Sequence, residues 1–144
     1  MGFFQLGPLA DAAVLHDPAR FVDAIFERWS PGGGASPAHR AEVAACLRTS
    51  MPEPVAMYRA QMGRASDVAA EFERLDGPSG HIHVPTLYLH GDRDGCIGVD
   101  HVHGQASRFP AGHETQIVEG AGHFLTLDAP KAVSRHLEAF VGTA

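Results

Sequence analysis

Two residues that can share a proton, Asp94 and His123, each follow a short apolar run in the second half of the chain. Asp94 comes after the run at residues 84–89, and His123, 29 positions after Asp94, comes after the run at residues 115–118. A carboxylate that bonds one imidazole nitrogen fixes the tautomer of the ring, so that the other nitrogen can act as a base. The pair therefore predicts general-base chemistry. The alternative, which the spacing leaves open, is that Asp94 closes a turn and His123 caps the next segment.

The elements that would position this pair are two strands of a parallel sheet. Short, nearly continuous apolar runs are typical of strands that are buried on both faces. A helix is expected over residues 102–109, between the strands, and a last helix is expected to open at residues 128–130. The second half of the chain is thus predicted to be a β-α-β-α unit, in which the loops at the carboxyl ends of parallel strands converge. Such a rim would bring Asp94 and His123 together.

The first eighty residues show the periodicity of helices and no strand. Asp17 is typical of a helix cap, and an apolar face follows it through Trp29. Helices are expected to begin at Pro18, Pro37, Pro54 and Ser66. The Gly- and Pro-rich cluster at residues 76–80 breaks the pattern. We therefore expect a helical region at residues 1–80 and an α/β region at residues 81–144.

The composition argues against two classes of partner. The chain has 144 residues, with 11 Lys and Arg against 17 Asp and Glu, a net charge of −6. A net acidic chain lacks the basic face that a nucleic-acid binder needs. No run approaches the roughly 18 apolar residues of a membrane-spanning helix, and the N-terminus lacks the features of a signal peptide. We expect a soluble, cytoplasmic protein that binds neither nucleic acid nor membrane, in which Cys46 and Cys96 are reduced.

Ten histidines also require a metal site to be considered. His-x-His pairs stand at residues 81–83 and 101–103, and Asp92, Asp94 and Cys96 lie between them. A hydrolytic zinc site takes three such ligands and a water. However, the first pair precedes its strand while Asp94 follows it, so the two lie at opposite ends of the sheet. Residues i and i+2 also do not share a helix face. We therefore expect no metal and no cofactor.

The two strand ends carry a resemblance to a known family. Residues 85–94, PTLYLHGDRD, resemble the segment of the α/β-hydrolase family that places the catalytic acid after the seventh strand. Residues 120–124, GAGHF, resemble the loop after the eighth strand that supplies the catalytic histidine. Residues 3–6, FFQL, and 57–59, MYR, are similar to the lid of the epoxide hydrolase and haloalkane dehalogenase branch. The resemblance implies a partial α/β-hydrolase fold, with a helical lid at residues 1–80 and the end of the core domain after it.

The resemblance also implies roles for individual residues. Asp94 would be the acid, with Asp92 as the alternative, and His123 would be the base that activates water. Tyr58 would donate a hydrogen bond to an epoxide oxygen as the ring opens; the alternative is that Tyr58 only packs the lid. The side chains expected to contact a small, hydrophobic substrate are Tyr58, Phe3, Phe4 and Trp29.

The sequence departs from the family at the nucleophile. The family displays Ser, Asp or Cys on a Gly-x-nucleophile-x-Gly elbow before the lid. Here residues 91–95 have the glycine spacing but centre on Arg93, and Ser36, in residues 34–38, is better explained as a helix cap. The resemblance therefore implies that the half with the nucleophile lies outside this sequence, and that the chain alone is inactive.

A sheet of two strands would have open hydrogen-bonding edges and is marginal by itself. We therefore expect the missing amino-terminal half, or a partner chain, to cover the sheet edge. Two alternatives for function stay open. One is a non-catalytic remnant or interaction module. The other is an ester hydrolase or haloalkane dehalogenase in place of an epoxide hydrolase.

Overall fold

A computed structural model describes residues 2–63 and 81–142, which form two compact units. The first unit comprises the described residues of Met1–Ala24 and Ser36–Pro78, and the second comprises those of Ile25–Ala35 and Ser79–Ala144. Residues 25–35 thus pack with the second unit although they precede much of the helical region. The helix expected from Ser66 and the cluster at residues 76–80 lie outside the described residues. The division of the chain into a lid at residues 1–80 and the end of a core domain at residues 81–144 stays a prediction.

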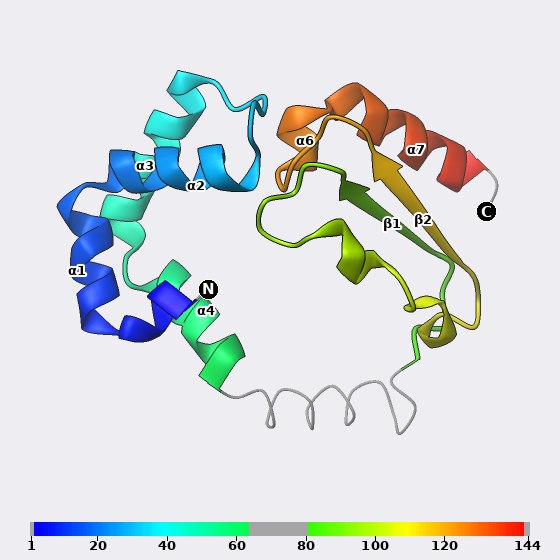
Figure 1. Cartoon of the computed structure of the whole chain (residues 1–144), viewed down its shortest axis with the longest axis horizontal. Helices are drawn as coiled ribbons and strands as arrows, with labels where there is room; N and C mark the ends of the chain where they lie inside the picture. Colours follow the sequence, from blue (N-terminus) through cyan, green and yellow to red (C-terminus); the bar gives the residue numbers. More distant parts are fainter. Residues whose placement is uncertain (1, 64–80, 143–144) are drawn as a thin grey trace. The chain divides into compact units, whose positions relative to one another are not determined.

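The first unit is helical (Figure 1). Its elements are a short 3₁₀ helix η1 (Gly2–Leu6), α1 (Pro8–His16), the first part of α2 (Pro18–Trp29), α3 (Pro37–Ser50) and α4 (Glu53–Gly63). Its buried apolar side chains are Phe4, Ala10, Val14, Val22, Ala44 and Val55. The sequence did not predict η1 or α1. Among the described residues, no strand precedes residue 80, as expected.

Helices α2 and α3 begin where their caps predicted. The Asp17 Oδ1 atom accepts a hydrogen bond from the Arg20 backbone N–H at 3.0 Å, and the Ser36 Oγ atom accepts one from the His39 N–H at 3.1 Å. Each side chain satisfies a backbone donor that the first helical turn leaves free. Proline at the first helical position loses no hydrogen bond. The interpretation of Ser36 as a cap is therefore confirmed.

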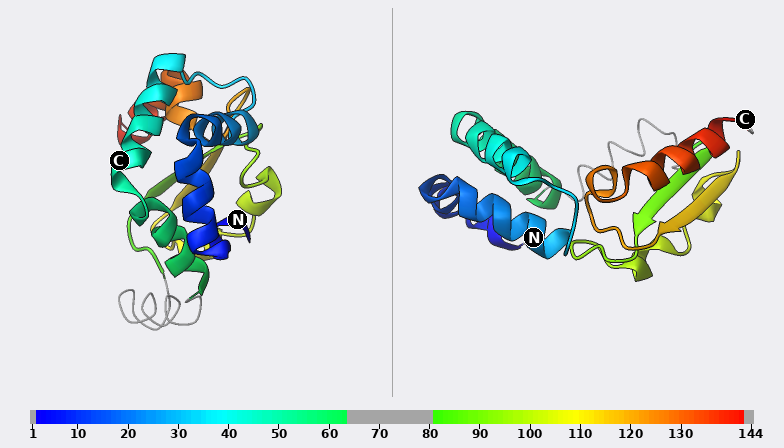
Figure 2. Two further views of the ribbon diagram at one scale, coloured as in Figure 1. Left: turned by 90° about the vertical axis from the view of Figure 1, so that its left-hand side faces the viewer. Right: turned by 90° about the horizontal axis from the view of Figure 1, so that it is seen from above.

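The second unit contains a parallel pair of strands, β1 (Thr86–Gly91) and β2 (His113–Val118). Their register runs from Thr86 opposite His113 to Gly91 opposite Val118. Two helices follow the sheet, the short α6 (Leu125–Asp128) and α7 (Pro130–Gly142). Helix α7 lies along one face of the two strands (Figure 2). The parallel pair and the last helix confirm the predicted order, whereas α6 was not predicted.

The link between the strands is not the helix that we expected over residues 102–109. It consists of two short 3₁₀ helices, η2 (Val99–Val102) and η3 (Ala106–Arg108). Gly104, between them, has a φ of +86°, a left-handed conformation that a continuous α-helix does not contain. The apolar spacing did mark a buried residue, because Val102 is only 2% exposed. The prediction of one helix over residues 102–109 was wrong, because Gly104 interrupts the helical backbone there.

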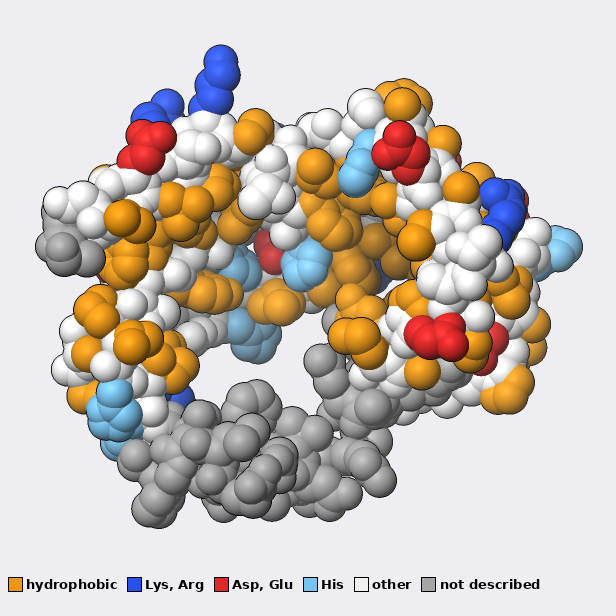
Figure 3. Space-filling view, turned by 180° about the vertical axis from the view of Figure 1, so that it is seen from behind, with side chains coloured by type: hydrophobic (Ala, Val, Ile, Leu, Met, Phe, Trp, Pro, Cys, Tyr) orange, Lys and Arg blue, Asp and Glu red, His pale blue; other side chains and the backbone are white. Residues whose placement is uncertain are grey.

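The described sheet has two strands, so each strand has one edge without a strand partner among the described residues. Hydrophobic side chains also reach the surface (Figure 3), among them Leu9, Val84 and Val141, which are 60–70% exposed. Along the described part of the chain, no helix is both long enough and apolar enough to cross a membrane.

Candidate active site

The carboxyl ends of β1 and β2 bring two loops side by side. We call residues 92–97 the acid loop and residues 119–124 the histidine loop. The Arg93 N–H donates to the Ala121 carbonyl at 2.9 Å, so the loops are bonded through their backbones. Gly91, the last residue of β1, is packed so closely that a Cβ atom there would collide with the Ala121 carbonyl oxygen. Glycine at this position therefore allows the two loops to approach.

The structure places the side chains of Asp94 and His123 in direct contact. The Nδ1 atom of His123 lies 2.9 Å from Oδ2 of Asp94. Because an ionised carboxylate only accepts hydrogen bonds, Nδ1 is the donor and Nε2 is the nitrogen that can act as a base. The Asp94 side chain is 6% exposed and that of His123 is 26% exposed, so the carboxylate is buried and the ring is accessible.

Backbone groups of the acid loop hold the other oxygen of the carboxylate. The Oδ1 atom of Asp94 accepts hydrogen bonds from the N–H groups of Cys96, at 2.7 Å, and Ile97, at 2.9 Å. Burial alone would raise the pKa of Asp94. The bonds from Ile97, the His123 ring and Cys96, together with the charge of His123, outweigh burial and hold this pKa below its usual value of 3.8. The carboxylate therefore stays ionised and can stabilise a protonated His123.

A buried histidine that sequence reasoning missed supports the acid loop. His90 is 4% exposed, and its Nε2 atom lies 3.1 Å from the Ile97 carbonyl oxygen and 3.9 Å from Oδ2 of Asp94. A carbonyl can only accept, so Nε2 carries a proton. Nδ1 lies 3.0 Å from the Tyr88 hydroxyl. The signal in the sequence was the spacing of Tyr88 and His90, because residues two positions apart in a strand lie on the same face.

Asp92, the alternative acid, performs a different task. Its Oδ1 atom accepts a hydrogen bond from the Gly120 N–H at 2.7 Å. Gly120 has a φ of +75°, which glycine adopts without strain. Asp92 thus ties the start of the acid loop to the start of the histidine loop. The geometry favours Asp94 over Asp92 as the partner of His123.

Trp29 lies beside the pair, in the second unit. Its ring meets that of His123 edge-to-face, with centroids 5.1 Å apart and planes at 72°, and it stacks on Phe124 at 6.1 Å. Of the four residues expected to contact substrate, Trp29 is therefore the one that contacts His123 within this unit. Its role toward a substrate stays a prediction.

The other three residues form an aromatic cluster in the first unit. The Phe4 and Tyr58 rings are stacked with centroids 4.8 Å apart, and Phe3 meets Phe4 edge-on at 5.6 Å. This packing agrees with the alternative interpretation of Tyr58, and its role as a donor to substrate stays a prediction.

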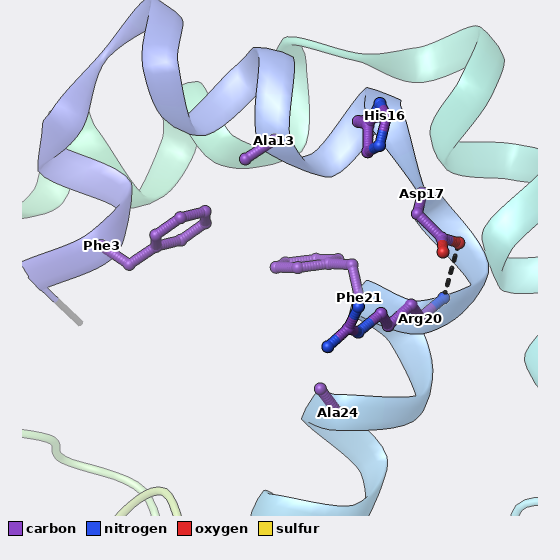
Figure 4. A pocket seen from close by; sticks show the side chains of 7 residues that line it. All are labelled: Phe3, Ala13, His16, Asp17, Arg20, Phe21 and Ala24. Atoms are coloured by element: carbon purple, nitrogen blue, oxygen red, sulfur yellow. Dashed lines mark hydrogen bonds between the residues drawn. The ribbon is translucent and has the colours of Figure 1, made fainter.

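A cavity of about 360 Å³ also lies in the first unit, next to Phe3. The rings of Phe3 and Phe21 point toward one another across it (Figure 4), with centroids 6.3 Å apart. Its lining residues are Phe3, Ala13, His16, Asp17, Arg20, Phe21 and Ala24.

In the part of the chain that the structure describes, the two cysteines and the two His-x-His pairs form no metal site. No group of three or more His, Cys, Asp and Glu side chains in that part could hold an ion. Cys46 and Cys96 are free thiols. Burial, followed by the charge of Asp94, raises the pKa of Cys96, so this thiol is a poor nucleophile.

The chain is similar to several solved structures, and two of them match nearly all of its length. One is the "putative epoxide hydrolase" of Klebsiella pneumoniae subsp. pneumoniae, with a TM-score of 0.72 and 22% sequence identity. The other is Cfl2 of Burkholderia cenocepacia, with a TM-score of 0.76 and 19% identity. This chain has part of the α/β-hydrolase fold. Each match covers 96% of this chain but only 47% and 46%, respectively, of the other, so this chain spans about half the length of both.

At these identities the likeness concerns the fold. No protein-family model matches the chain, and no curated protein matches it either.

Proposed function

We propose that this chain supplies the acid–base pair of an epoxide-hydrolase-like enzyme that works through a covalent ester intermediate. The observation that carries the proposal is the 2.9 Å contact between His123 Nδ1 and Asp94 Oδ2. The pair stands at the carboxyl ends of two parallel strands, where open α/β sheets bind their ligands. The partial resemblance of the fold to that of an α/β-hydrolase supports the same interpretation.

In this mechanism, a nucleophile from residues outside the 144 forms an ester with the substrate. Water then attacks the ester carbonyl carbon while Nε2 of His123 takes its proton, and that proton passes to the departing oxygen as the carbon–oxygen bond breaks. The ionised carboxylate of Asp94 stabilises the imidazolium formed in between. No cofactor takes part.

The partners follow from the same proposal. The aromatic side chains of Phe3, Phe4, Tyr58 and Trp29 favour a small, hydrophobic substrate. The half of the enzyme that carries the nucleophile, in the same chain or in a partner, would cover a free edge of the two-stranded sheet. A cytoplasmic location stays a prediction.

The test is reconstitution. This chain would be co-expressed with the amino-terminal half of the Klebsiella protein, and hydrolysis of an epoxide series, a haloalkane and a chromogenic ester would be measured. We expect turnover only when both halves are present. Asp94→Asn should lower kcat by about 10³–10⁴-fold, because the His123 tautomer is no longer fixed. Asp100→Asn, at an exposed carboxylate in η2, is the matched control and should keep full activity.

A further variant reports on the intermediate. With a carboxylate nucleophile, His123→Ala should form the ester but not hydrolyse it, so mass spectrometry should detect a covalent adduct. With a hydroxyl nucleophile, no adduct should form, because attack itself needs the base. Full hydrolysis by this chain alone, or by His123→Ala, would contradict the proposal.

A further inference from the structure

The end of α2 and the turn after it, residues 29–34, contact both loops of the candidate site. The Trp29 carbonyl oxygen accepts two hydrogen bonds, one from the Gly95 N–H of the acid loop at 3.1 Å and one from the His123 N–H at 2.9 Å. One carbonyl therefore joins the loops that carry the acid and the base. These residues lie far from both loops in sequence but belong to the same compact unit.

Ser30 adds a side-chain bond to this segment. It is only 2% exposed, and its Oγ atom accepts a hydrogen bond from the Phe124 N–H at 2.9 Å. The bonds to residues 29 and 30 thus hold two consecutive N–H groups of the histidine loop, those of His123 and Phe124. Two anchors on adjacent peptide units fix the backbone from which the His123 ring projects.

Gly122 also packs closely against Ser30. A Cβ atom on Gly122 would collide with the Ser30 Cα atom and would lie 2.6 Å from Ser30 Oγ. Glycine at position 122 therefore allows Ser30 to pack against the histidine loop. A hydroxyl in this place can hold the Phe124 N–H, whereas a methyl group would leave this part-buried donor without its acceptor.

Asp128 secures the same segment from α6. Its Oδ1 atom accepts from the Gly34 N–H at 2.9 Å, and its Oδ2 atom accepts from the Gly122 N–H at 2.8 Å. The histidine loop is thus tied to residues 29–34 both directly and through one carboxylate.

We propose that Ser30 is a positioning residue for His123. Its hydroxyl holds the histidine loop in the place where Nδ1 meets Asp94, and it takes no part in the chemistry. The effect on hydrolysis rests on the proposed function, because a shift of about 1 Å in a reacting group can cost about 10²-fold in rate. The effect on the Asp94–His123 hydrogen bond does not depend on any reaction.

The test compares Ser30→Ala with Ser36→Ala in the full chain. Both variants lose a hydroxyl that accepts a backbone N–H, but the Ser36 bond caps α3 in the first unit. The ¹⁵N resonances of the His123 ring, at a pH where the ring is neutral, show which nitrogen carries the proton. We expect protonated Nδ1 in the unmodified chain and in Ser36→Ala, and a mixture of tautomers in Ser30→Ala.

An unchanged tautomer in Ser30→Ala would overturn the proposal, as would a protonated Nε2 in the unmodified chain. If Ser30→Ala does not fold, Ser30→Cys takes its place, because sulfur is a weaker acceptor that still fills the space of the hydroxyl. A mixed tautomer in Ser30→Cys then supports the proposal, and an unchanged one overturns it. In the reconstituted hydrolase, Ser30→Ala should lower kcat about 10–100-fold with little change in KM. If reconstitution gives no hydrolysis, the proposed function fails while the NMR comparison still decides the role of Ser30.

Discussion

In the first unit, aromatic rings gather around Phe4, whereas in the second unit hydrogen bonds join segments that are far apart in sequence. The first unit packs Phe3, Phe21 and Tyr58 against Phe4 at centroid distances of 4.8–6.3 Å. The second unit joins Asp92 to Gly120, Asp94 to His123 and Ser30 to Phe124, at 2.7–2.9 Å.

The difference indicates which side-chain substitutions each unit can tolerate. Apolar packing depends mainly on volume, so a region held by rings can accept another side chain of similar size. A hydrogen bond weakens steeply with distance and angle, so a region held by such bonds keeps its atoms in fixed places. A proton-transferring pair needs the second kind of support.

The largest expected effect is on the first unit. Phe4→Ala should lower the free energy of unfolding of the full chain by about 3 kcal/mol, because Phe4 is only 6% exposed and the smaller side chain leaves a cavity. Phe4→Leu should cost about 1 kcal/mol, because it keeps most of the volume. Urea unfolding followed by circular dichroism measures both. If leucine is as costly as alanine, the first unit depends on ring geometry and the contrast between the units fails.

The next largest effect is expected from a methyl group added to the second unit. Gly122→Ala should lower the free energy of unfolding by about 2 kcal/mol, because the added Cβ meets the backbone of Ser30. Gly98→Ala is the matched control, since Gly98 has a φ of −67° and nothing within 4 Å of the added atom. Equal unfolding free energies for the two variants would show that the second unit adapts as readily as the first.

The smallest effect should be on the way stability depends on pH in acid. Because the pKa of Asp94 is lowered in the folded chain, its contribution to stability is present above the usual value of 3.8 and is lost as the pH falls through the lowered value. Asp94→Asn should therefore be less stable near neutral pH, and its stability should vary less below pH ~4.

The control for this acid dependence is Asp23→Asn in the first unit. The Asp23 side chain is 53% exposed and lies 3.4 Å from an Arg40 nitrogen. Exposed pairs of this kind contribute little to stability. Unfolding followed by fluorescence between pH 3 and 7 measures all three chains. If both variants flatten the acid dependence equally, the buried pair of the second unit is not its source.

The features that local patterns determine were predictable from the sequence. Prolines preceded by Asp17 and Ser36 marked the starts of α2 and α3, and the two apolar runs marked β1 and β2. Parallel strands end at one rim, so the contact between Asp94 and His123 followed from topology.

The remaining features depend on contacts that local patterns do not reveal. Helix α1 was missed because its apolar residues are spread around the helix and give no distinct face. The role of residues 29–34 was missed because a carbonyl such as that of Trp29 carries no sequence signature of its partners. In the sequence Ser30 is one more residue of the turn after Trp29, and its burial against Gly122 and its bond to the Phe124 N–H are visible only in the structure.

The order of segments in the second unit has a consequence for how such chains can change during evolution. Ile25–Ala35 and Ser79–Ala144 make one unit, while Met1–Ala24 and Ser36–Pro78, which lie on either side of Ile25–Ala35 in sequence, make the other. Recombination that exchanges both segments of the first unit should leave the bonds among Trp29, Ser30 and the two loops the same. A chimaera designed from this chain should therefore keep residues 25–35 with the second unit. It should exchange Met1–Ala24 and Ser36–Pro78 together, because Phe4 of the one segment stacks on Tyr58 of the other.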